Sequence, residues 1–428
     1  MSYPATWYAT QTATPSSFPT LRGTIEADVC IVGGGLAGLT TARELLKAGM
    51  SVALLEAKRI AWGASGRNGG FVSPGFALGI ESIVARVGLG AAKELYGLSK
   101  LGHDMVRAAI AELAPQASMG SGWIVALRHP GRAGLEAHRQ LMSDAFGAPG
   151  EVWTAERTRA VLKSERYHEA LFVPEAFHIQ PLAYAHALAR DVAARGGRVY
   201  EHSPALAWAK SGAAFEVRVG GGAVRASQLV FCTGGYDRSL FAPLAGSVLP
   251  VSTYIAVTEP IDARARLAID TEAAVSDTRR AGDYYRLLPQ GRILWGGRIT
   301  TRHSEPSRLA ERMKADMLSV YPQLGNPRMD FAWGGLMGYA RHKMPVIGEA
   351  GAGLWMASAF GGHGLNTTAM AGGLIAGAMA AGDDRWKLFA PFGAPWAGGP
   401  LGQAAVQISY WAMQLRDRFE ETGGFSRR

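Results

Sequence analysis

The chain of 428 residues contains little cysteine, no concentrated positive charge and few charged residues for its length. Its two cysteines, Cys30 and Cys232, exclude a disulfide framework and favour a reducing compartment. Lys and Arg exceed Asp and Glu by 44 to 35, but no block of five or six basic residues occurs, so a nucleic-acid partner is not expected. With 48% hydrophobic and 18% charged residues, the composition also excludes a disordered chain.

Signals for export and for membrane insertion are missing as well. The first twenty residues are polar and rich in Pro, Thr and Ser, without a charged start followed by an apolar run, so no signal peptide is expected. The longest apolar stretch, residues 354–381, is interrupted by His363 and Asn366 and is dominated by Gly and Ala. This composition favours a tightly packed helix over a membrane span. We therefore expect a cytoplasmic protein without a transmembrane segment.

What the chain has is a strand, a glycine turn, a helix and a second strand in close succession. Residues 27–32 are a short apolar run typical of a buried parallel strand, and residues 52–56 predict another. The segment between them has apolar residues at helical spacing and ends at Gly49, a plausible left-handed cap. The pattern predicts a βαβ unit.

The turn of this unit carries the spacing Gly33-x-Gly35-x-x-Gly38. In that context the glycines permit a tight turn, a close approach of the backbone to a pyrophosphate, and helix packing against the strand. The helix N-terminus supplies free N–H groups and the positive end of a dipole. Glu56 stands at the end of the second strand, where a carboxylate accepts hydrogen bonds from ribose hydroxyls. The sequence therefore predicts a dinucleotide site.

Later segments repeat the alternation of strands and helices and predict an α/β fold. The simplest arrangement is one discontinuous Rossmann-like nucleotide-binding domain and a second, inserted domain on a mostly antiparallel sheet. The expected division is an N-terminal extended arm (1–24), the nucleotide-binding domain in three segments (25–84, 171–242 and 336–385), the substrate domain (85–170 and 243–335) and a C-terminal helical extension (386–428) with a helix over 403–419.

Several motifs resemble one known family, the D-amino-acid-oxidase-type FAD-dependent oxidoreductases, and within it the γ-glutamylputrescine oxidoreductase-like branch. The resemblance runs from about residue 20 to about residue 420. It implies a glutathione-reductase-like FAD-binding domain with an inserted α+β substrate domain and the flavin ring at the domain interface. The motifs that carry it are residues 33–38 with Glu56, 62–70, 179–182, 284–287, 333–336, 338–348 and 361–364.

The resemblance also implies which residues hold FAD. They belong to the glycine turn, the ribose strand, the loop that follows it, and three later segments. The expected cofactor residues are Gly33, Gly35, Leu36, Ala37, Gly38, Glu56, Ala57, Lys58, Gly63, Ala64, Ser65, Arg67, Asn68, Gly69, Gly70, Ala205, Thr233, Gly234, Gly338, Gly361, Gly362, Gly364, Leu365, Asn366 and Thr367. Arg67 and Asn68 stand where some relatives have a flavin-linked His, and neither cysteine lies near the expected ring, so FAD is predicted to be non-covalent.

The chemistry implied by the resemblance is oxidation of the C–N bond of a small amine or amino acid. A hydride passes to the flavin, the imine product is hydrolysed, and O2 usually reoxidises the flavin to give H2O2. Two departures from the family bear on this. Leu294 stands at the position of a lysine that promotes reaction with oxygen, which leaves a dehydrogenase with another electron acceptor open. Asn366 replaces a lysine that holds a substrate carboxylate, which favours an amine over an α-amino acid.

Candidates for substrate contact each have a structural alternative. A histidine in the glycine loop bonds the cofactor, orients the substrate or satisfies loop carbonyls. An arginine after a strand holds an anion or is simply exposed, and aromatic residues form a cage around an amine or pack in a core. The candidates are His363, Arg298, Tyr254, Tyr285, Trp295 and Trp333. No metal-ligand spacing and no Ser-His-Asp or Cys-His pattern is recognised.

Two further functions stay open at this point. Flavin domains of the same superfamily occur in tRNA-modification oxidoreductases, and the charge of +9 is compatible with RNA although it is dispersed. A biosynthetic tailoring enzyme would perform the same chemistry on a larger amine.

Overall fold

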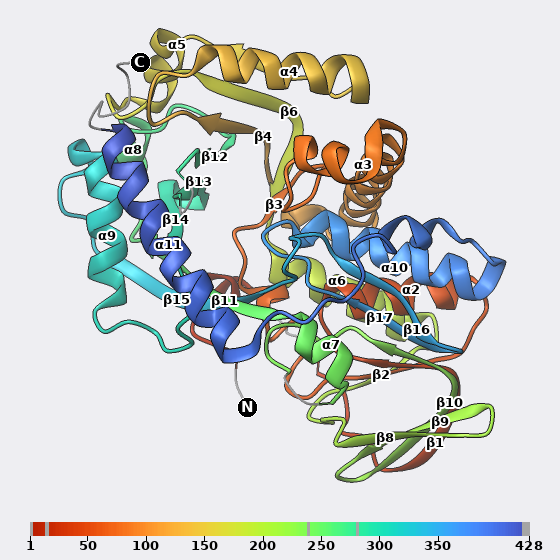
Figure 1. Cartoon of the computed structure of the whole chain (residues 1–428). Helices are drawn as coiled ribbons and strands as arrows, with labels where there is room; N and C mark the ends of the chain where they lie inside the picture. Colours follow the sequence, from red (N-terminus) through yellow and green to blue (C-terminus); the bar gives the residue numbers. More distant parts are fainter. Residues whose placement is uncertain (1–2, 13–16, 238–239, 280–281, 422–428) are drawn as a thin grey trace.

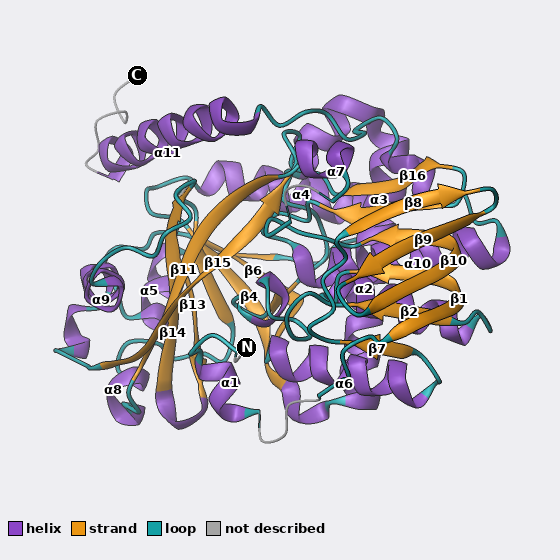
Figure 2. Ribbon diagram, turned by 90° about the horizontal axis from the view of Figure 1, so that it is seen from below, coloured by secondary structure: helices purple, strands orange, loops and turns teal. Residues whose placement is uncertain are grey.

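The computed structural model describes residues 3–12, 17–237, 240–279 and 282–421. Within these residues the strands form two sheets that lie side by side, the first at the right and the second at the left of Figure 2. Each sheet is assembled from segments far apart in the sequence, as the mixture of colours in Figure 1 shows.

The first sheet has eight strands, five of which form a parallel core. Its main path is β16-β17-β10-β1-β2-β7; β16 pairs antiparallel with β17, and the β8–β9 hairpin pairs antiparallel with β10. The strands are β1 (Gly23–Val32), β2 (Val52–Leu55), β7 (Arg198–Tyr200), β8 (Ala207–Ser211), β9 (Ala214–Val219), β10 (Gly222–Phe231), β16 (Val346–Gly351) and β17 (Leu354–Ser358).

Both faces of this sheet are buried, which explains its near-continuous apolar strands. Val29 and Ile31 of β1 pack into a cluster shared with the helices, whereas Cys30 and Val32 pack into a second cluster on the opposite face. Four helices that contact one another make up the helical layer. They are α2 (Leu36–Lys47), α3 (Ile80–Leu113), α6 (Pro181–Ala194) and α10 (Gly364–Ala381).

The second sheet has nine strands in the order β15-β11-β14-β13-β12-β4-β6-β3, with β5 paired to β6. Among its described pairs, β4 with β12 is the parallel one and the others are antiparallel. The strands are β3 (Phe71–Val72), β4 (Ser118–Ala126), β5 (Glu151–Trp153), β6 (Ala170–Ile179), β11 (Leu249–Thr258), β12 (Ala274–Asp277), β13 (Tyr284–Leu288), β14 (Arg292–Thr300) and β15 (Met329–Tyr339). The expected combination of a Rossmann-like sheet with a mostly antiparallel second sheet is confirmed.

The two faces of the second sheet have different neighbours. We call the face that packs into the cluster of the first sheet, through residues such as Ile255 and Leu294, the inner face. The outer face has its own cluster, which Met313 and Met317 of α9 close. The remaining helices and 3₁₀ turns are α1 (Trp7–Gln11), α4 (Arg132–Phe146), α5 (Ala155–Leu162), α7 (Ala242–Ser247), α8 (Asp262–Arg266), α9 (Leu309–Val320), α11 (Gly399–Glu421), η1 (Ala64–Gly66), η2 (Pro115–Ala117), η3 (Pro289–Gly291), η4 (Pro322–Leu324) and η5 (Arg385–Phe389).

Sheet membership differs from the expected division in several places. β3 and β6 belong to the second sheet although their residues were assigned to the nucleotide-binding domain, and β15 continues four residues past the expected end at 335. α3 was assigned to the substrate domain, yet it packs on α10 and α6. The apolar pattern predicts a helix or a strand but does not say which neighbour covers it, so we propose the division with these elements exchanged.

The N-terminal arm is not extended throughout, because residues 7–11 form α1. Thr6 caps this helix by accepting a hydrogen bond from the N–H of Ala9 at 3.1 Å. Trp7 and Tyr8 are buried in the cluster of the first sheet. The Tyr8 hydroxyl donates to the carbonyl of Asn68 at 2.9 Å, so the arm contacts the loop in which FAD residues were expected.

At the other end, α11 covers the predicted C-terminal helix and crosses in front of the second sheet in Figure 1. Its polar side chains face the body, where Gln407 accepts hydrogen bonds from the Thr300 hydroxyl at 2.7 Å and the Thr301 N–H at 3.0 Å. Leu401, Ile408, Trp411 and Leu415 are exposed on α11. No helix in the described part of the chain is long and apolar enough to cross a membrane.

Candidate cofactor and substrate site

The glycine turn between β1 and α2 is closed by backbone contacts that exclude side chains. Gly33 has φ +116°, and a Cβ there would lie 2.7 Å from the carbonyl oxygen of Cys232. A Cβ at Gly38 would lie 2.0 Å from the carbonyl oxygen of Gly33. The turn therefore brings bare backbone to the start of α2, where the N–H of Leu36 donates to Ser65 Oγ at 3.0 Å. This is the arrangement that a pyrophosphate requires.

Glu56 follows β2 and reaches back under the turn. Its Oε2 accepts from the N–H of Gly34 at 2.8 Å and its Oε1 from the N–H of Lys58 at 2.7 Å. Burial raises the pKa of this carboxyl, and the nearby Glu201 raises it further, while the backbone donors oppose the shift. A carboxylate has about four acceptor sites, so two remain for ribose hydroxyls.

Replacing Glu56 with alanine should weaken FAD binding about 10- to 150-fold, the equivalent of about 1.5–3 kcal/mol for hydrogen bonds to a charged group. Titration of FAD-free protein with FAD, followed by quenching of flavin fluorescence, measures the change. Glu56→Gln keeps the shape and one acceptor oxygen and should lose less. Unchanged FAD affinity in the alanine variant would remove Glu56 from the cofactor site.

The loop after β2 is held by its own side chains. Asn68 Nδ2 donates to the carbonyls of Ala64 at 3.1 Å and Ser65 at 3.0 Å, and Asn68 Oδ1 accepts from the N–H of Gly70 at 2.9 Å. The amide of Asn68 thus uses both its ends inside the loop. Its position supports a role in shaping the loop, which we propose in place of direct contact with FAD.

Arg67 in the same loop carries the observation that best fits a cofactor. Its Nε donates to the carbonyl of Trp62 at 2.8 Å, its Nη1 donates to Gly334 at 3.2 Å, and the guanidinium lies 4.3 Å from the Trp62 ring. Nη2 is buried with no described partner, and burial lowers the pKa of the group. A buried cationic donor without an acceptor fits a phosphate or a flavin carbonyl.

The third glycine segment, residues 361–364, packs against the end of β15. The N–H of Gly361 donates to the carbonyl of Gly338 at 2.8 Å, and α10 starts directly after His363. A Cβ at Gly361 would lie 2.7 Å from the ring of Tyr339. Bare backbone and a helix N-terminus therefore face Tyr339, an arrangement that suits a flat ring and favours negative charge.

Asn366 lies inside α10 and faces away from this space. It is buried, and its Nδ2 donates to the carbonyls of Gly75 at 3.0 Å and Ser99 at 3.4 Å. The side chain joins α10 to α3. In the described structure the position of the family's carboxylate-binding lysine therefore holds a residue whose amide is already engaged.

The other expected cofactor residues lie at the ends of strands of the first sheet or in α10. Thr233 and Gly234 follow β10, and Ala57 and Lys58 follow Glu56. Ala205 packs on the cluster that lies on the face of the first sheet opposite the helices. Leu365 and Thr367 are buried in the first turn of α10. Both cysteines are buried and free, and burial raises the pKa of the Cys232 thiol to about 12. Non-covalent FAD remains our prediction.

The predicted aromatic cage is not formed, because three of its members point to the outer face. Tyr285 stacks on Trp295 with ring centroids 4.5 Å apart, and its hydroxyl bonds to those of Tyr167 and Tyr321. Tyr254 belongs to the same outer cluster. Successive side chains of a strand point to opposite faces, so the residues next to these in sequence are the ones that lie on the inner face.

The two remaining candidates, Arg298 and Trp333, lie on opposite faces of the second sheet. Arg298 forms an ion pair with Asp316 of α9, with Nη2 to Oδ1 at 2.8 Å, on the outer side. Trp333 lies on the inner side, where its Nε1 donates to the carbonyl of Arg67 at 3.0 Å. Trp333 thus touches the loop that we assign to FAD, and Arg298 does not.

Two tyrosines that the sequence analysis did not select lie against the glycine segments, Tyr284 against Gly69 and Tyr339 against Gly361, and His363 lies near Trp123. A Cβ at Gly69 would lie 2.8 Å from the ring of Tyr284, and the charges of Tyr284 and Tyr339 are close enough to influence each other. His363 lies 6.3 Å from Trp123 between ring centroids, and burial lowers its pKa to about 4. Burial also raises the pKa of both tyrosines. These aromatic side chains beside the glycine segments are therefore neutral.

A pair of variants tests this assignment of faces. Tyr285→Phe should lower the free energy of unfolding by about 1–2 kcal/mol, because it leaves buried hydroxyls of the outer cluster without a partner. It should leave kcat/KM within about twofold of the parent, a factor of only ~0.4 kcal/mol. Tyr284→Phe should alter kcat/KM with little loss of stability. Urea unfolding and steady-state kinetics of both variants give the comparison, and a loss of kcat/KM confined to Tyr285→Phe would reverse the assignment.

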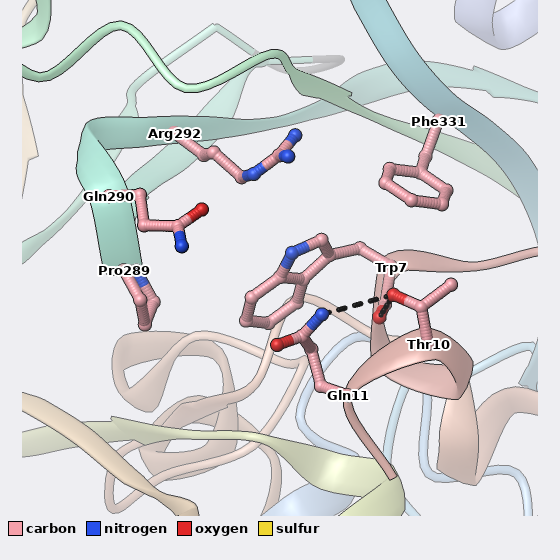
Figure 3. A pocket seen from close by; sticks show the side chains of 7 residues that line it. All are labelled: Trp7, Thr10, Gln11, Pro289, Gln290, Arg292 and Phe331. Carbon is pink, nitrogen blue, oxygen red and sulfur yellow. Dashed lines mark hydrogen bonds between the residues drawn. The ribbon is translucent and has the colours of Figure 1, made fainter. Parts of the chain in front are cut away.

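A separate hollow of about 150 Å³ lies between α1 and the turn after β13 (Figure 3). Its lining consists of Trp7, Thr10, Gln11, Pro289, Gln290, Arg292 and Phe331. None of these belongs to the glycine segments described above. In the described residues no group of three or more His, Cys, Asp or Glu side chains could hold a metal ion.

A glycine turn at the start of a helix, with a buried carboxylate after the second strand of the same parallel sheet, defines a dinucleotide-binding protein. The chain belongs to the DAO family of FAD dependent oxidoreductases, whose family model matches residues 28–378. FAD is therefore its cofactor, and the protein is an enzyme.

Individual relatives agree over most of the chain. It is 30% identical to the γ-glutamylputrescine oxidoreductase of Escherichia coli, over 97% of this chain and 98% of that protein. It is 29% identical to the probable oxidoreductase OrdL of Haemophilus influenzae, over 94% of each chain. Among solved structures, glycine oxidase from Bacillus cereus superposes with a TM-score of 0.71 at 19% identity, covering 85% of this chain and 98% of that one. L-Proline dehydrogenase from P. horikoshii superposes with a TM-score of 0.72 at 18% identity, covering 87% and 96%.

Proposed function

We propose that the enzyme oxidises the C–N bond of a small amine or amino compound, with hydrolysis of the resulting imine and reoxidation by O2 to give H2O2. The observation that carries the proposal is the neutral aromatic lining formed by Tyr284, Tyr339, Trp123 and His363 beside the glycine segments. No described carboxylate hydrogen-bonds to these four side chains, so the site is suited to an uncharged amine.

The chain's own residues divide the work of holding the two molecules. The glycine turn and α2 would hold the pyrophosphate, Glu56 the ribose, and Arg67 an oxygen of the cofactor. Bound FAD supplies a hydride acceptor. Tyr284 and Tyr339 would orient the amine and keep water out, and their raised pKa values keep them protonated as hydrogen-bond donors. His363 stays uncharged, so it adds no positive charge to the site that binds the uncharged amine.

Relatives and residues together favour an amine without a carboxylate next to the reacting carbon. One relative is named for γ-glutamylputrescine, an amine of that kind. The amide of Asn366 is engaged with Gly75 and Ser99, so this position offers no cation for an α-carboxylate. Solved structures with the same fold include glycine oxidase and L-proline dehydrogenase, which makes amino acids the comparison set for the assay.

A dehydrogenase is the second candidate, and one residue favours it. Leu294 lies on the inner face of β14, fully buried, where the family likeness places an oxygen-promoting lysine. A leucine there supplies no positive charge to promote reaction with oxygen, which favours an electron acceptor other than O2.

The test is a visible spectrum of the purified enzyme under anaerobic conditions, before and after addition of single compounds. Bleaching of the flavin band by γ-glutamylputrescine or putrescine, and not by glycine or L-proline, is the expected result. Admission of air then separates the candidates, because rapid return of colour with H2O2 formation indicates an oxidase. An enzyme that only amino acids bleach would overturn the assignment to amines.

A further inference from the structure

Arg286 is a fully buried cation that has no negatively charged partner among the described residues. It lies on the inner face of β13 and has no exposed surface. Its Nη1 donates to His178 Nδ1 at 2.9 Å, and its Nη2 donates to the carbonyl of Ile179 at 2.8 Å and the hydroxyl of Tyr8 at 3.2 Å. Nε has no described acceptor, and no described carboxylate lies within 4.0 Å of the guanidinium.

The groups around Arg286 are neutral. His178 Nε2 lies 2.8 Å from the carbonyl of Glu272, so Nε2 carries the proton and Nδ1 accepts from Arg286. Burial and the charge of Arg286 lower the pKa of His178 to about 3, which keeps the ring uncharged. The Tyr8 hydroxyl donates its hydrogen bond to the carbonyl of Asn68 and accepts one from Arg286, so it stays neutral. One full positive charge therefore remains uncompensated inside the protein, where an unpaired ion is costly.

Arg286 lies against the end of the loop of residues 63–70 that is farther from the glycine turn. A Cβ at Gly70 would lie 2.8 Å from Arg286 Nη2, so the loop of residues 63–70 passes directly against the guanidinium. The same loop begins at the pyrophosphate end, where Ser65 accepts from Leu36 at the start of α2. The atoms nearest to a Cβ added at the glycines of the turn belong to residues 31–65 and 232–233, and none of these atoms lies in a strand of the second sheet. Arg286 is therefore at the ring end of the loop.

We propose that Arg286 offsets the negative charge that the FAD ring gains on reduction. A hydride brings two electrons and one proton to a neutral ring, which leaves one negative charge. Arg286 supplies the matching positive charge, and Leu294, its cross-strand neighbour on the same face, supplies none. The role is electrostatic: Arg286 raises the reduction potential of bound FAD and favours anionic adducts of the ring.

The test uses the FAD-loaded enzyme and no amine, so its outcome is independent of the proposed substrate. Sulfite adds to oxidised flavin and leaves a negatively charged adduct, which bleaches the visible band. Arg286→Met should raise the Kd for sulfite about 10- to 100-fold, the size expected for loss of one buried unit charge. The two-electron potential should fall by about 30–60 mV, which is the same factor expressed as a potential. Arg286→Lys keeps the charge and should stay within about threefold of the parent.

A second pair of variants leaves Arg286 in place, so the proposal is decided even if Arg286→Met does not hold FAD. Leu294→Glu puts a carboxylate beside the guanidinium and should weaken sulfite binding about tenfold or more by pairing with it. Leu294→Gln has the same shape without the charge and should bind sulfite nearly as the parent does. Equal sulfite affinity and equal potential in the charged and uncharged members of either loaded pair would overturn the proposal.

Discussion

Gly35→Val should give a protein that leaves purification without FAD. A Cβ at this position would lie 2.9 Å from Ser65 Oγ, the group that accepts from Leu36 at the start of α2. The methyl groups of valine must then displace Ser65 or occupy the space before the helix N-terminus where the pyrophosphate binds. We expect the Kd for FAD to rise at least about 100-fold, equivalent to ~2.7 kcal/mol.

The measurement is the ratio of flavin to protein absorbance after purification, followed by titration of the FAD-free protein. Gly97→Ala is the matched control, because this exposed glycine of α3 has nothing within 4 Å of an added Cβ. That variant should be yellow and fully loaded. A Gly35→Val protein with the parent's flavin content would contradict the placement of the pyrophosphate at this turn.

The rate of flavin reduction by an amine should rise about tenfold for each pH unit between pH 6 and 9 at low amine concentration. Only the neutral amine can give up a hydride, and an alkyl amine has a pKa near that of lysine, about 10.4. Burial lowers the pKa of His363 to about 4, so this residue is neutral throughout the range. Burial raises the pKa values of Tyr284 and Tyr339, so both keep their protons.

Stopped-flow measurement under anaerobic conditions gives the pH profile directly. His363, Tyr284 and Tyr339 contribute no ionisation in this range, so the logarithm of the rate constant should have a slope of one against pH. A histidine with an ordinary pKa near 6.5 would add a second step and steepen the slope below that value. Such a step, removed by His363→Asn, would show that His363 titrates and that the site is wetter than described.

The glycine turn could be predicted because its information is local. Strand, turn, helix and carboxylate all lie within residues 27–56, and each constrains the next through backbone geometry. The helix α2 was accessible for the same reason, since its apolar residues recur at helical spacing, and α10 was expected from a composition dominated by Gly and Ala. Short elements such as α1 were missed because five residues carry too little periodicity.

The inner face of the second sheet could not be predicted in this way. Strands that face water on one side alternate visibly between apolar and polar residues, whereas β11 and β13 are covered on both sides and buried almost throughout. The sequence does not show which of two neighbouring residues in such a strand lies on the inner face, so Tyr285 looks as suitable as Tyr284. The error moved the aromatic candidates by one residue and therefore to the opposite face.

The order of strands in the first sheet determines when the cofactor can be bound during synthesis of the protein. β1 lies beside β10, and β10 lies beside β17, so the sheet cannot be completed before residue 358 has been made. The third glycine segment and α10 come later still, with more than 300 residues between Gly33 and Gly361. At roughly 5–20 residues per second, translation separates the two by about 15 to 65 s. FAD therefore joins a nearly finished chain, and the nascent N-terminal βαβ unit spends that interval without the strands and helix that complete its binding site.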